Sequence, residues 1–189
     1  MSADYAAQRT NMVESQVRVA DVTDLTVQDA MRHVAREALT PEGKGYMAYA
    51  DAEIEYAPGR WMLKPRDIAK LLQALAPRVG ERALAIAAPY AALILEAMGL
   101  EVTLADAADE IAATELFDVI VCEGAVTRAP AAWLAALAPG GRLGVVERNG
   151  PVGRAMLYLR SGATVGSRPL FDSTPPVLAG FEAAHRFTF

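Results

Sequence analysis

The stretch Arg82-Ala83-Leu84-Ala85-Ile86-Ala87 decides the fold of this chain of 189 residues. It is short and almost entirely apolar, which is typical of a strand that is buried on both faces. Residues 90–98 follow as an apolar helix closed by Gly99, and residues 101–105 form a second short strand pattern. A strand, a helix and another strand in this order predict a parallel pair joined by a crossover.

The same alternation continues toward the C-terminus. Residues 117–122 predict a third strand, residues 130–138 a helix and residues 142–146 a fourth strand. Two further runs, 154–160 and 164–170, are joined through a Ser-Gly turn and predict a hairpin. The sequence therefore predicts an α/β fold whose sheet is mostly parallel and ends in a C-terminal antiparallel hairpin.

The N-terminal part has a mainly helical pattern. Apolar residues recur at helical spacing over residues 12–20 and again over residues 27–35. Pro65 opens a third helix, because proline is well suited to the first helical position. Between these helices, residues 49–56 carry alternating acidic side chains, which is typical of a solvated edge strand.

The composition narrows the classes of function. A formal net charge of -5 argues against broad attraction to nucleic acid or to anionic lipid. One cysteine and two histidines exclude an internal disulfide and leave almost no ligands for a zinc site. The longest apolar run, around residues 83–95, is too short to span a membrane, and the N-terminus does not resemble a secretory signal. We therefore expect a cytoplasmic protein.

Several short motifs along the sequence match one known family. They are Met12-Val13-Glu14-Ser15-Gln16, Ala30-Met31, Arg36-Glu37, Ala48-Tyr49-Ala50-Asp51, Gly80-Glu81-Arg82 and Pro139-Gly140-Gly141-Arg142-Leu143. In this order they resemble the protein-L-isoaspartate O-methyltransferase family, which has the class I S-adenosylmethionine (SAM) methyltransferase fold. The last motif occurs across class I methyltransferases, and the N-terminal motifs point to the isoaspartate branch.

The resemblance implies an organisation and an activity. It implies a single domain with a Rossmann-like core at residues 80–189 and a helical, substrate-side region at residues 1–79. The family transfers a methyl group from SAM to the α-carboxylate of an L-isoaspartyl residue in a protein or peptide. Because a carboxylate is already a nucleophile at neutral pH, such a reaction needs positioning and desolvation more than a general base.

The cofactor loop departs from the family pattern. The family has a G-x-G-x-G turn after the first strand, where glycines let the backbone approach the ligand. Here the strand runs into Ala87-Ala88-Pro89-Tyr90, so Ala87, Ala88 and Tyr90 stand at the cofactor-binding positions. Pro89 has no N–H to offer at the helix start. The family usually has an acidic residue within that strand, and in this sequence the corresponding position is Ala85.

A second departure follows the second strand. By the resemblance, Asp106 stands where the family places the acid that binds the ribose hydroxyls, although an Asp at a strand end is also a common helix cap. Only residues 107–117 separate it from Asp118. A crossover helix alone takes about ten residues or more. We therefore expect the usual third strand and its helix to be missing.

A third departure precedes the helix that begins at Pro65. The family's T-[IV]-S-Q-P motif supplies a hydroxyl near the acceptor carboxylate, and aligned on Pro65 the position of that serine is Leu63. Lys64 is a candidate partner for an acceptor carboxylate, although a single lysine beside a helix start is more often solvated. The resemblance also implies that Asp51 belongs to a substrate loop or supports the residues around the substrate. The alternative, that Asp51 is simply a solvated carboxylate on a strand, stays open.

Four further features have structural interpretations. His33 falls on the polar face of its helix, and Cys122 lies in an apolar strand as a buried thiol. Asn149-Gly150 is a favoured turn dipeptide and, by its chemistry, a place where isoaspartate forms readily. Residues 186–189 alternate like a closing strand.

Three hypotheses about function follow. The first is a member of the family whose SAM site has decayed and whose fold serves binding or assembly. The second is an active methyltransferase with an altered cofactor loop. The third is a binding module for another small ligand, with Asp106 and Glu123 as polar contacts, since Glu123 ends its strand and ligands sit at the carboxyl ends of such strands.

The missing strand also predicts a partner. Without it, residues 101–105 become the edge of the sheet, and bare edges are usually covered or paired. We therefore expect a homodimer joined through this strand.

Overall fold

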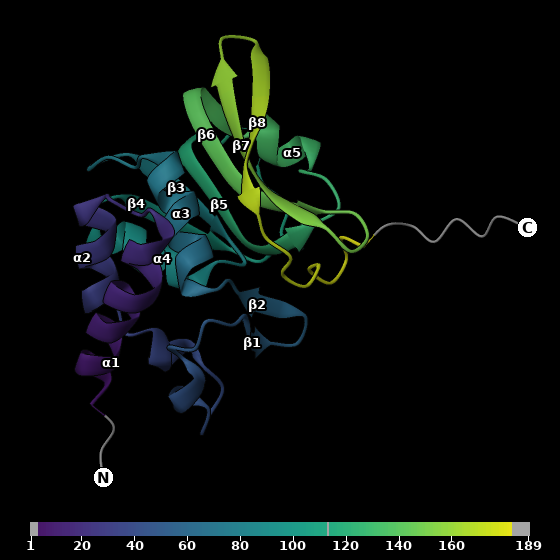
Figure 1. The fold of residues 1–189 in the computed structure, drawn as a ribbon. Helices are drawn as coiled ribbons and strands as arrows, with labels where there is room; N and C mark the ends of the chain where they lie inside the picture. Colours follow the sequence, from purple (N-terminus) through teal and green to yellow (C-terminus); the bar gives the residue numbers. More distant parts are fainter. Residues whose placement is uncertain (1–3, 113, 183–189) are drawn as a thin grey trace, which may run out of the picture.

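A computed structural model describes residues 4–112 and 114–182, and its centre is a six-stranded sheet with the order β4-β3-β5-β6-β7-β8 (Figure 1). The first four of these strands run parallel, and β7 and β8 continue the sheet as an antiparallel hairpin. This confirms the predicted mixed sheet. The strands are β3 (Arg82–Ile86), β4 (Glu101–Ala105), β5 (Phe117–Val126), β6 (Leu137–Arg148), β7 (Gly153–Ser161) and β8 (Thr164–Asp172).

The remaining elements are mostly helical. The helices are α1 (Tyr5–Met12), α2 (Leu25–His33), α3 (Pro65–Leu75), α4 (Pro89–Ala97) and α5 (Ala131–Ala135). A π-helical turn (Val13–Val17) and three short 3₁₀ turns (Arg18–Ala20, Arg36–Leu39 and Gly45–Met47) lie between them. A separate antiparallel hairpin is formed by β1 (Ile54–Ala57) and β2 (Arg60–Met62). None of the helices within the described ranges is long and apolar enough to cross a membrane.

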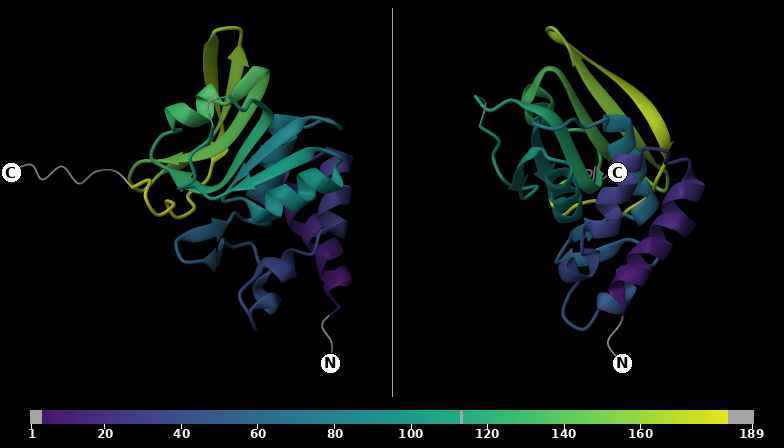
Figure 2. Two further views of the ribbon diagram at one scale, coloured as in Figure 1. Left: turned by 180° about the vertical axis from the view of Figure 1, so that it is seen from behind. Right: turned by 90° about the vertical axis from the view of Figure 1, so that its left-hand side faces the viewer.

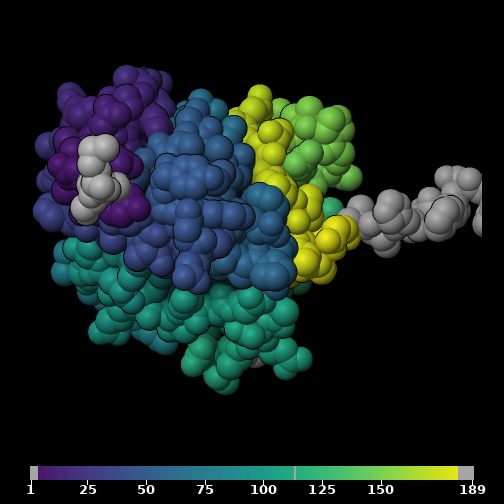
Figure 3. Space-filling model, turned by 90° about the horizontal axis from the view of Figure 1, so that it is seen from below, coloured from purple at the N-terminus to yellow at the C-terminus, as the bar shows by residue number. Residues whose placement is uncertain are grey.

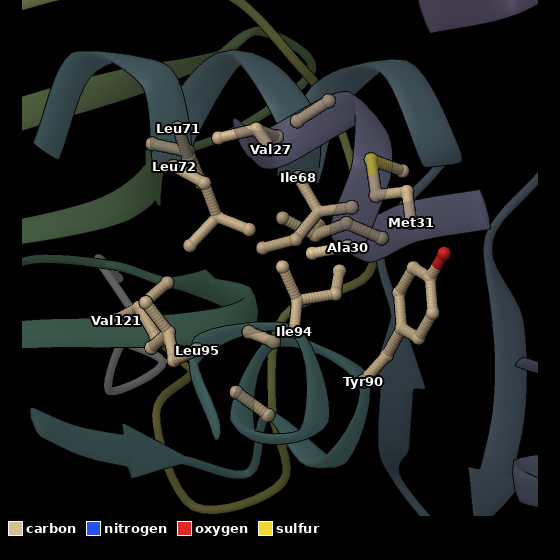
Figure 4. Packing of buried hydrophobic residues seen from close by; sticks show 14 of the residues in the cluster. Val27, Ala30, Met31, Ile68, Leu71, Leu72, Tyr90, Ile94, Leu95 and Val121 are labelled. Carbon is tan, nitrogen blue, oxygen red and sulfur yellow. The ribbon is translucent and has the colours of Figure 1, made fainter. Parts of the chain in front are cut away.

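The helices of the N-terminal part and α4 cover one face of the sheet. Helix α2 begins where the side chain of Asp24 accepts the N–H groups of Thr26 and Val27, and its apolar stripe points inward. Figure 4 shows this stripe meeting side chains from α3, α4 and β5 in one packed layer. The labelled residues are Val27, Ala30, Met31, Ile68, Leu71, Leu72, Tyr90, Ile94, Leu95 and Val121.

The opposite face of the sheet has a thinner cover. Its buried cluster includes Phe117 and Leu143 from the strands, Trp133 from α5 and Leu178 from the C-terminal segment. Ile111, in the connection between β4 and β5, packs against the same cluster. Within the described residues this connection contains no strand, so β4 is a sheet edge, as the short spacing predicted. The β7–β8 hairpin projects beyond the helices (Figure 2).

Several predicted boundaries were wrong. Helix α2 ends at His33, because Val34 is already extended. Strand β1 begins only at Ile54, so Asp51 lies in the bend before it. Helix α5 has five residues, since its last turn is replaced by the start of β6, where Leu137 pairs with Phe117. Residues 186–189, the predicted closing strand, lie outside the described residues.

Gly153 provides a test of how the C-terminal segment is seated. A Cβ at this position would overlap the backbone oxygen of Ser173, whereas a Cβ at Gly166 on β8 would meet no atom within 4 Å. We expect Gly153→Ala to lower the free energy of unfolding by about 1–3 kcal/mol, because backbone atoms yield less readily than a flexible side group. Gly166→Ala is the matched control and should leave the free energy of unfolding unchanged. Urea unfolding of both variants measures this, and equal midpoints would contradict it.

Candidate functional site at the carboxyl ends of the strands

The candidate site lies where β3, β4 and β5 end, which is the side of an open α/β sheet that binds ligands. Figure 3 looks at the molecule from this side. Blue residues of the N-terminal half, yellow residues of the C-terminal segment and teal residues of the α/β core meet there in one continuous surface. Among the predicted site residues, Ala87, Ala88, Tyr90 and Glu123 are buried, whereas Asp51 and Asp106 are exposed.

Glu123 is the central residue of this region. Its side chain is fully buried. One carboxylate oxygen accepts the backbone N–H of Ala91 in α4 at 2.9 Å, and the other accepts the N–H of Leu63 at 2.8 Å. The prediction that Glu123 ends its strand and faces a cleft was wrong, because β5 continues to Val126 and the Glu123 side chain is buried within it. Its carboxylate instead ties the start of α4 to the residue that follows β2.

The charge of Glu123 is balanced by a second buried residue. Burial raises the pKa of the Glu123 carboxyl, whereas the nearby Arg36 guanidinium and the backbone N–H donors lower it. Arg36 is itself fully buried, and its guanidinium donates to the carbonyl oxygens of Ala48 and Leu63. It also lies 4.6 Å from the centre of the Tyr90 ring. Arg36, Glu123 and Tyr90 thus form a buried polar cluster around the start of α4.

The loop between β3 and α4 is closed over this cluster. Ala87 has a positive φ of 47°, and its N–H donates to the carbonyl oxygen of Ala105 on β4. Ala88 is the N-cap residue but offers no capping side group, and Pro89 is the first helical residue. Ala87, Ala88 and Tyr90 are all buried. At the cofactor-binding positions inferred from the resemblance, the side chains are therefore packed in the interior and are not presented at the surface of the described residues.

Asp106 is engaged by an arginine from the β1–β2 hairpin. Arg60 donates Nε to one carboxylate oxygen at 2.9 Å and Nη2 to the other at 2.6 Å, which is a bidentate pair. Hydrogen bonds from Arg60, with a further one from the Ala108 N–H, lower the pKa of Asp106 to about 2. The oxygens that would bind ribose hydroxyls are thus already occupied by a guanidinium.

Residues 173–182, which we call the C-terminal strap, cross the end of β5. The Ala125 N–H donates to the Pro176 carbonyl oxygen, and the Leu178 N–H donates to the Ala125 carbonyl oxygen. Leu178 is fully buried. A Cβ at Gly124 would lie only 2.6 Å from the Leu178 Cδ2 atom, so this close packing requires a glycine at position 124. Arg60 donates to the Ala179 carbonyl oxygen, so the strap and the Arg60–Asp106 pair form one continuous cover.

The residues inferred on the acceptor side are each engaged in other contacts. Leu63 is buried, so its side chain takes part in the core. The Lys64 Nζ atom lies 3.7 Å from Glu53, and Asp51 lies 3.6 Å from an Arg66 nitrogen. These are solvent-accessible ion pairs of the kind that contributes little to stability. Whether these residues contact a substrate stays a prediction.

Sequence reasoning missed the two arginines that matter most here. Arg36 was part of a matched motif, yet nothing in the motif indicates a buried guanidinium. Arg60 follows Gly59 at the tip of a hairpin, where a solvated side chain is the ordinary expectation. The prediction that Cys122 is a buried thiol was confirmed, and burial raises the pKa of this thiol.

Comparison with solved structures defines the class of the fold. No protein-family model matches this protein. A protein-L-isoaspartate O-methyltransferase from Plasmodium falciparum, solved with S-adenosyl-L-homocysteine, superposes with a TM-score of 0.72 over 90% of this chain and 97% of that one, at 16% identity. Another structure of that name superposes equally well over 92% of this chain and 67% of its own. The architecture is that of a Rossmann-like methyltransferase.

Sequence relatives define the family. A protein-L-isoaspartate O-methyltransferase of Methylorubrum extorquens is 34% identical over 184 residues, which covers 82% of this chain and 80% of the relative. The protein of that name from Methylorubrum populi is also 34% identical, and the match covers 81% of this chain and 85% of that relative. The chain belongs to the protein-L-isoaspartate O-methyltransferase family, as the sequence motifs predicted.

The role of Glu123 can be tested by replacing its carboxylate. In Glu123→Gln the amide supplies one acceptor oxygen for two buried N–H donors, so we expect a loss of about 1–3 kcal/mol in the free energy of unfolding. Glu123→Ala should cost about 3–5 kcal/mol, because it also leaves the Arg36 charge without its counter-charge. Glu96→Gln, exposed on α4, is the control and should change stability by less than about 0.5 kcal/mol. Equal denaturation midpoints for all three variants would contradict this role.

Proposed function

We propose that this member of the family has lost methyl transfer from SAM and that its fold serves binding or assembly. The observation that carries the proposal is the fully buried Glu123, whose carboxylate accepts the backbone N–H of Ala91 in the first turn of α4 and the N–H of Leu63 after β2. The N-terminus of a helix is otherwise a ready-made site for an anionic ligand group. Here that site is filled by the protein's own carboxylate.

Two other features support the same conclusion. A ribose needs the free oxygens of Asp106, and Arg60 binds both of them. A cofactor also needs a backbone that it can approach, but the loop carries Ala87, Ala88 and Pro89, and both alanines are buried. The residues present therefore do not fit SAM.

The second candidate function is methyl transfer to isoaspartyl residues of proteins with an altered loop. It is favoured by the 34% identity to relatives that carry the name of that enzyme. It would require Arg60 to leave Asp106 and a ligand to replace the Glu123 carboxylate. The third candidate, another small ligand held by Asp106 and Glu123, meets the same two obstacles.

Calorimetric titration with S-adenosyl-L-homocysteine separates these candidates. We expect no heat of binding at millimolar ligand, because the helix N-terminus and the ribose acid are already engaged. The Methylorubrum extorquens relative, titrated in parallel, is the positive control. Micromolar binding by this protein would overturn the proposed loss of cofactor binding and favour the active enzyme.

We further propose that two copies pair through β4. The N–H of Glu101 and the carbonyl oxygen of Ala105 bond to the β3 side, so alternate residues Val102 and Leu104 direct their backbone groups outward. Two antiparallel copies centred on Thr103 would place each Val102 opposite the other copy's Leu104. This register covers the Leu104 side chain, which is 57% exposed in one copy.

Sedimentation measures this pairing. We expect a dimer that strengthens with added salt, because Glu101 and other acidic residues lie near the shared edge and salt screens their repulsion. Leu104→Lys should give a monomer. Leu159→Lys, on the exposed side of the β7–β8 hairpin, is the matched control and should remain dimeric. A monomeric wild-type protein at high concentration and high salt would overturn the proposal.

A further inference from the structure

The turn between β6 and β7 has the chemistry of a modification site. Asn149 and Gly150 are both exposed at its tip, and Gly150 has a positive φ of 87°. Within the described part of the protein, the structure gives the Gly150 backbone N–H no acceptor. The nitrogen that follows the asparagine is thus exposed to water and is not held by secondary structure.

This arrangement permits a spontaneous reaction with balanced atoms. The Gly150 backbone nitrogen, on losing its proton, attacks the carbonyl carbon of the Asn149 amide group. The bond between that carbon and the amide nitrogen breaks, ammonia leaves and a five-membered succinimide forms. Water then opens the ring at either carbonyl, and opening at the backbone carbonyl leaves an isoaspartyl residue. Glycine favours the attack because it has no side group to hinder the approach.

A second asparagine in the sequence can be compared with Asn149. Asn11 is the only other asparagine, and it lies in α1 directly before Met12. The helix fixes the backbone around Asn11, whose carbonyl oxygen also accepts a hydrogen bond from the Ser15 hydroxyl. A bulky residue follows Asn11, and Met12 is buried. The same reaction is therefore blocked at this position.

Arg148 connects the turn to the C-terminal strap. Its Nε donates to the Gly150 carbonyl oxygen at 3.0 Å, and its Nη1 donates to the carbonyl oxygens of Thr174 and Pro175 at 3.1 and 2.9 Å. An isoaspartyl residue at position 149 would add a carboxylate and a backbone methylene beside this guanidinium. The present acceptors of Arg148 are neutral carbonyl oxygens, so a new carboxylate, whose charge attracts the guanidinium, competes with them for Arg148.

We propose that Asn149 is a site of isoaspartate formation, and that its conversion withdraws Arg148 from the C-terminal strap and loosens the strap over the end of β5. The protein would then itself be a substrate for an active isoaspartyl methyltransferase. This inference does not depend on whether the protein has lost its own activity.

Ageing the full-length protein in mildly alkaline buffer tests the modification. We expect the peptide that contains Asn149 to gain one dalton, and the peptide that contains Asn11 to stay unchanged. An added active isoaspartyl methyltransferase with labelled SAM should then label the aged protein but not fresh protein. Aged Asn149→Gln should take up no label. Unchanged mass at Asn149, or equal labelling of the Asn149→Gln variant, would overturn the proposal.

Hydrogen exchange tests the coupling to the strap. The Ala125 amide is the reporter, because it donates to the Pro176 carbonyl oxygen. We expect its exchange to quicken several-fold in aged wild type, with the amide of Ile120 on the same strand unchanged. Aged Asn149→Gln should keep the exchange rate of fresh protein. An unchanged Ala125 rate in fully converted protein would overturn the coupling.

One further arm separates this inference from the proposed function. Labelled SAM is added to aged protein without any other enzyme, and we expect no label. Label that appears only in wild type and not in Asn149→Gln would support the modification site while contradicting the proposed loss of methyl transfer.

Discussion

The rest of the site depends on one buried carboxylate and the two backbone amides that it accepts. Glu123 lies on β5, Ala91 on α4 and Leu63 directly after β2, so a single side chain joins three elements that are distant in sequence. An ionised carboxylate away from water is costly unless it is hydrogen-bonded and near a counter-charge. Arg36 supplies that charge from the N-terminal region. The N-terminal region and the α/β core are therefore joined electrostatically as well as by packing.

The arrangement of strands was predictable because each strand carries its own signal. Apolar runs such as β3 and β5 are buried on both faces, and the short spacing between Asp106 and Asp118 indicated a missing strand. Boundaries were less predictable where two elements compete for the same residues. The end of α5 is an example: alanines favour continuing the helix, but pairing of Leu137 with Phe117 starts β6 instead. Tertiary pairing outweighed local preference there.

The candidate site was predictable in position but not in content. The ends of β3 and β5 are adjacent, so Ala87, Tyr90 and Glu123 do lie together. The sequence could not reveal that Glu123 is buried, because this depends on Leu63 and Ala91 presenting amides from other elements. Nor could it reveal that Arg60 reaches Asp106 across 46 positions of the sequence. Such pairings arise from the tertiary arrangement and leave no local pattern.

Ala87 retains the left-handed backbone that glycines ordinarily supply at this turn. An alanine in this conformation is strained by about 1 kcal/mol or more, so the surrounding structure, including the hydrogen bond from the Ala87 N–H to the Ala105 carbonyl oxygen, must hold the turn in this geometry. The path of this loop therefore does not require a glycine at position 87. A lineage can exchange the residues that contact a ligand while the path of its backbone persists, and such a protein still superposes on the structures of its relatives.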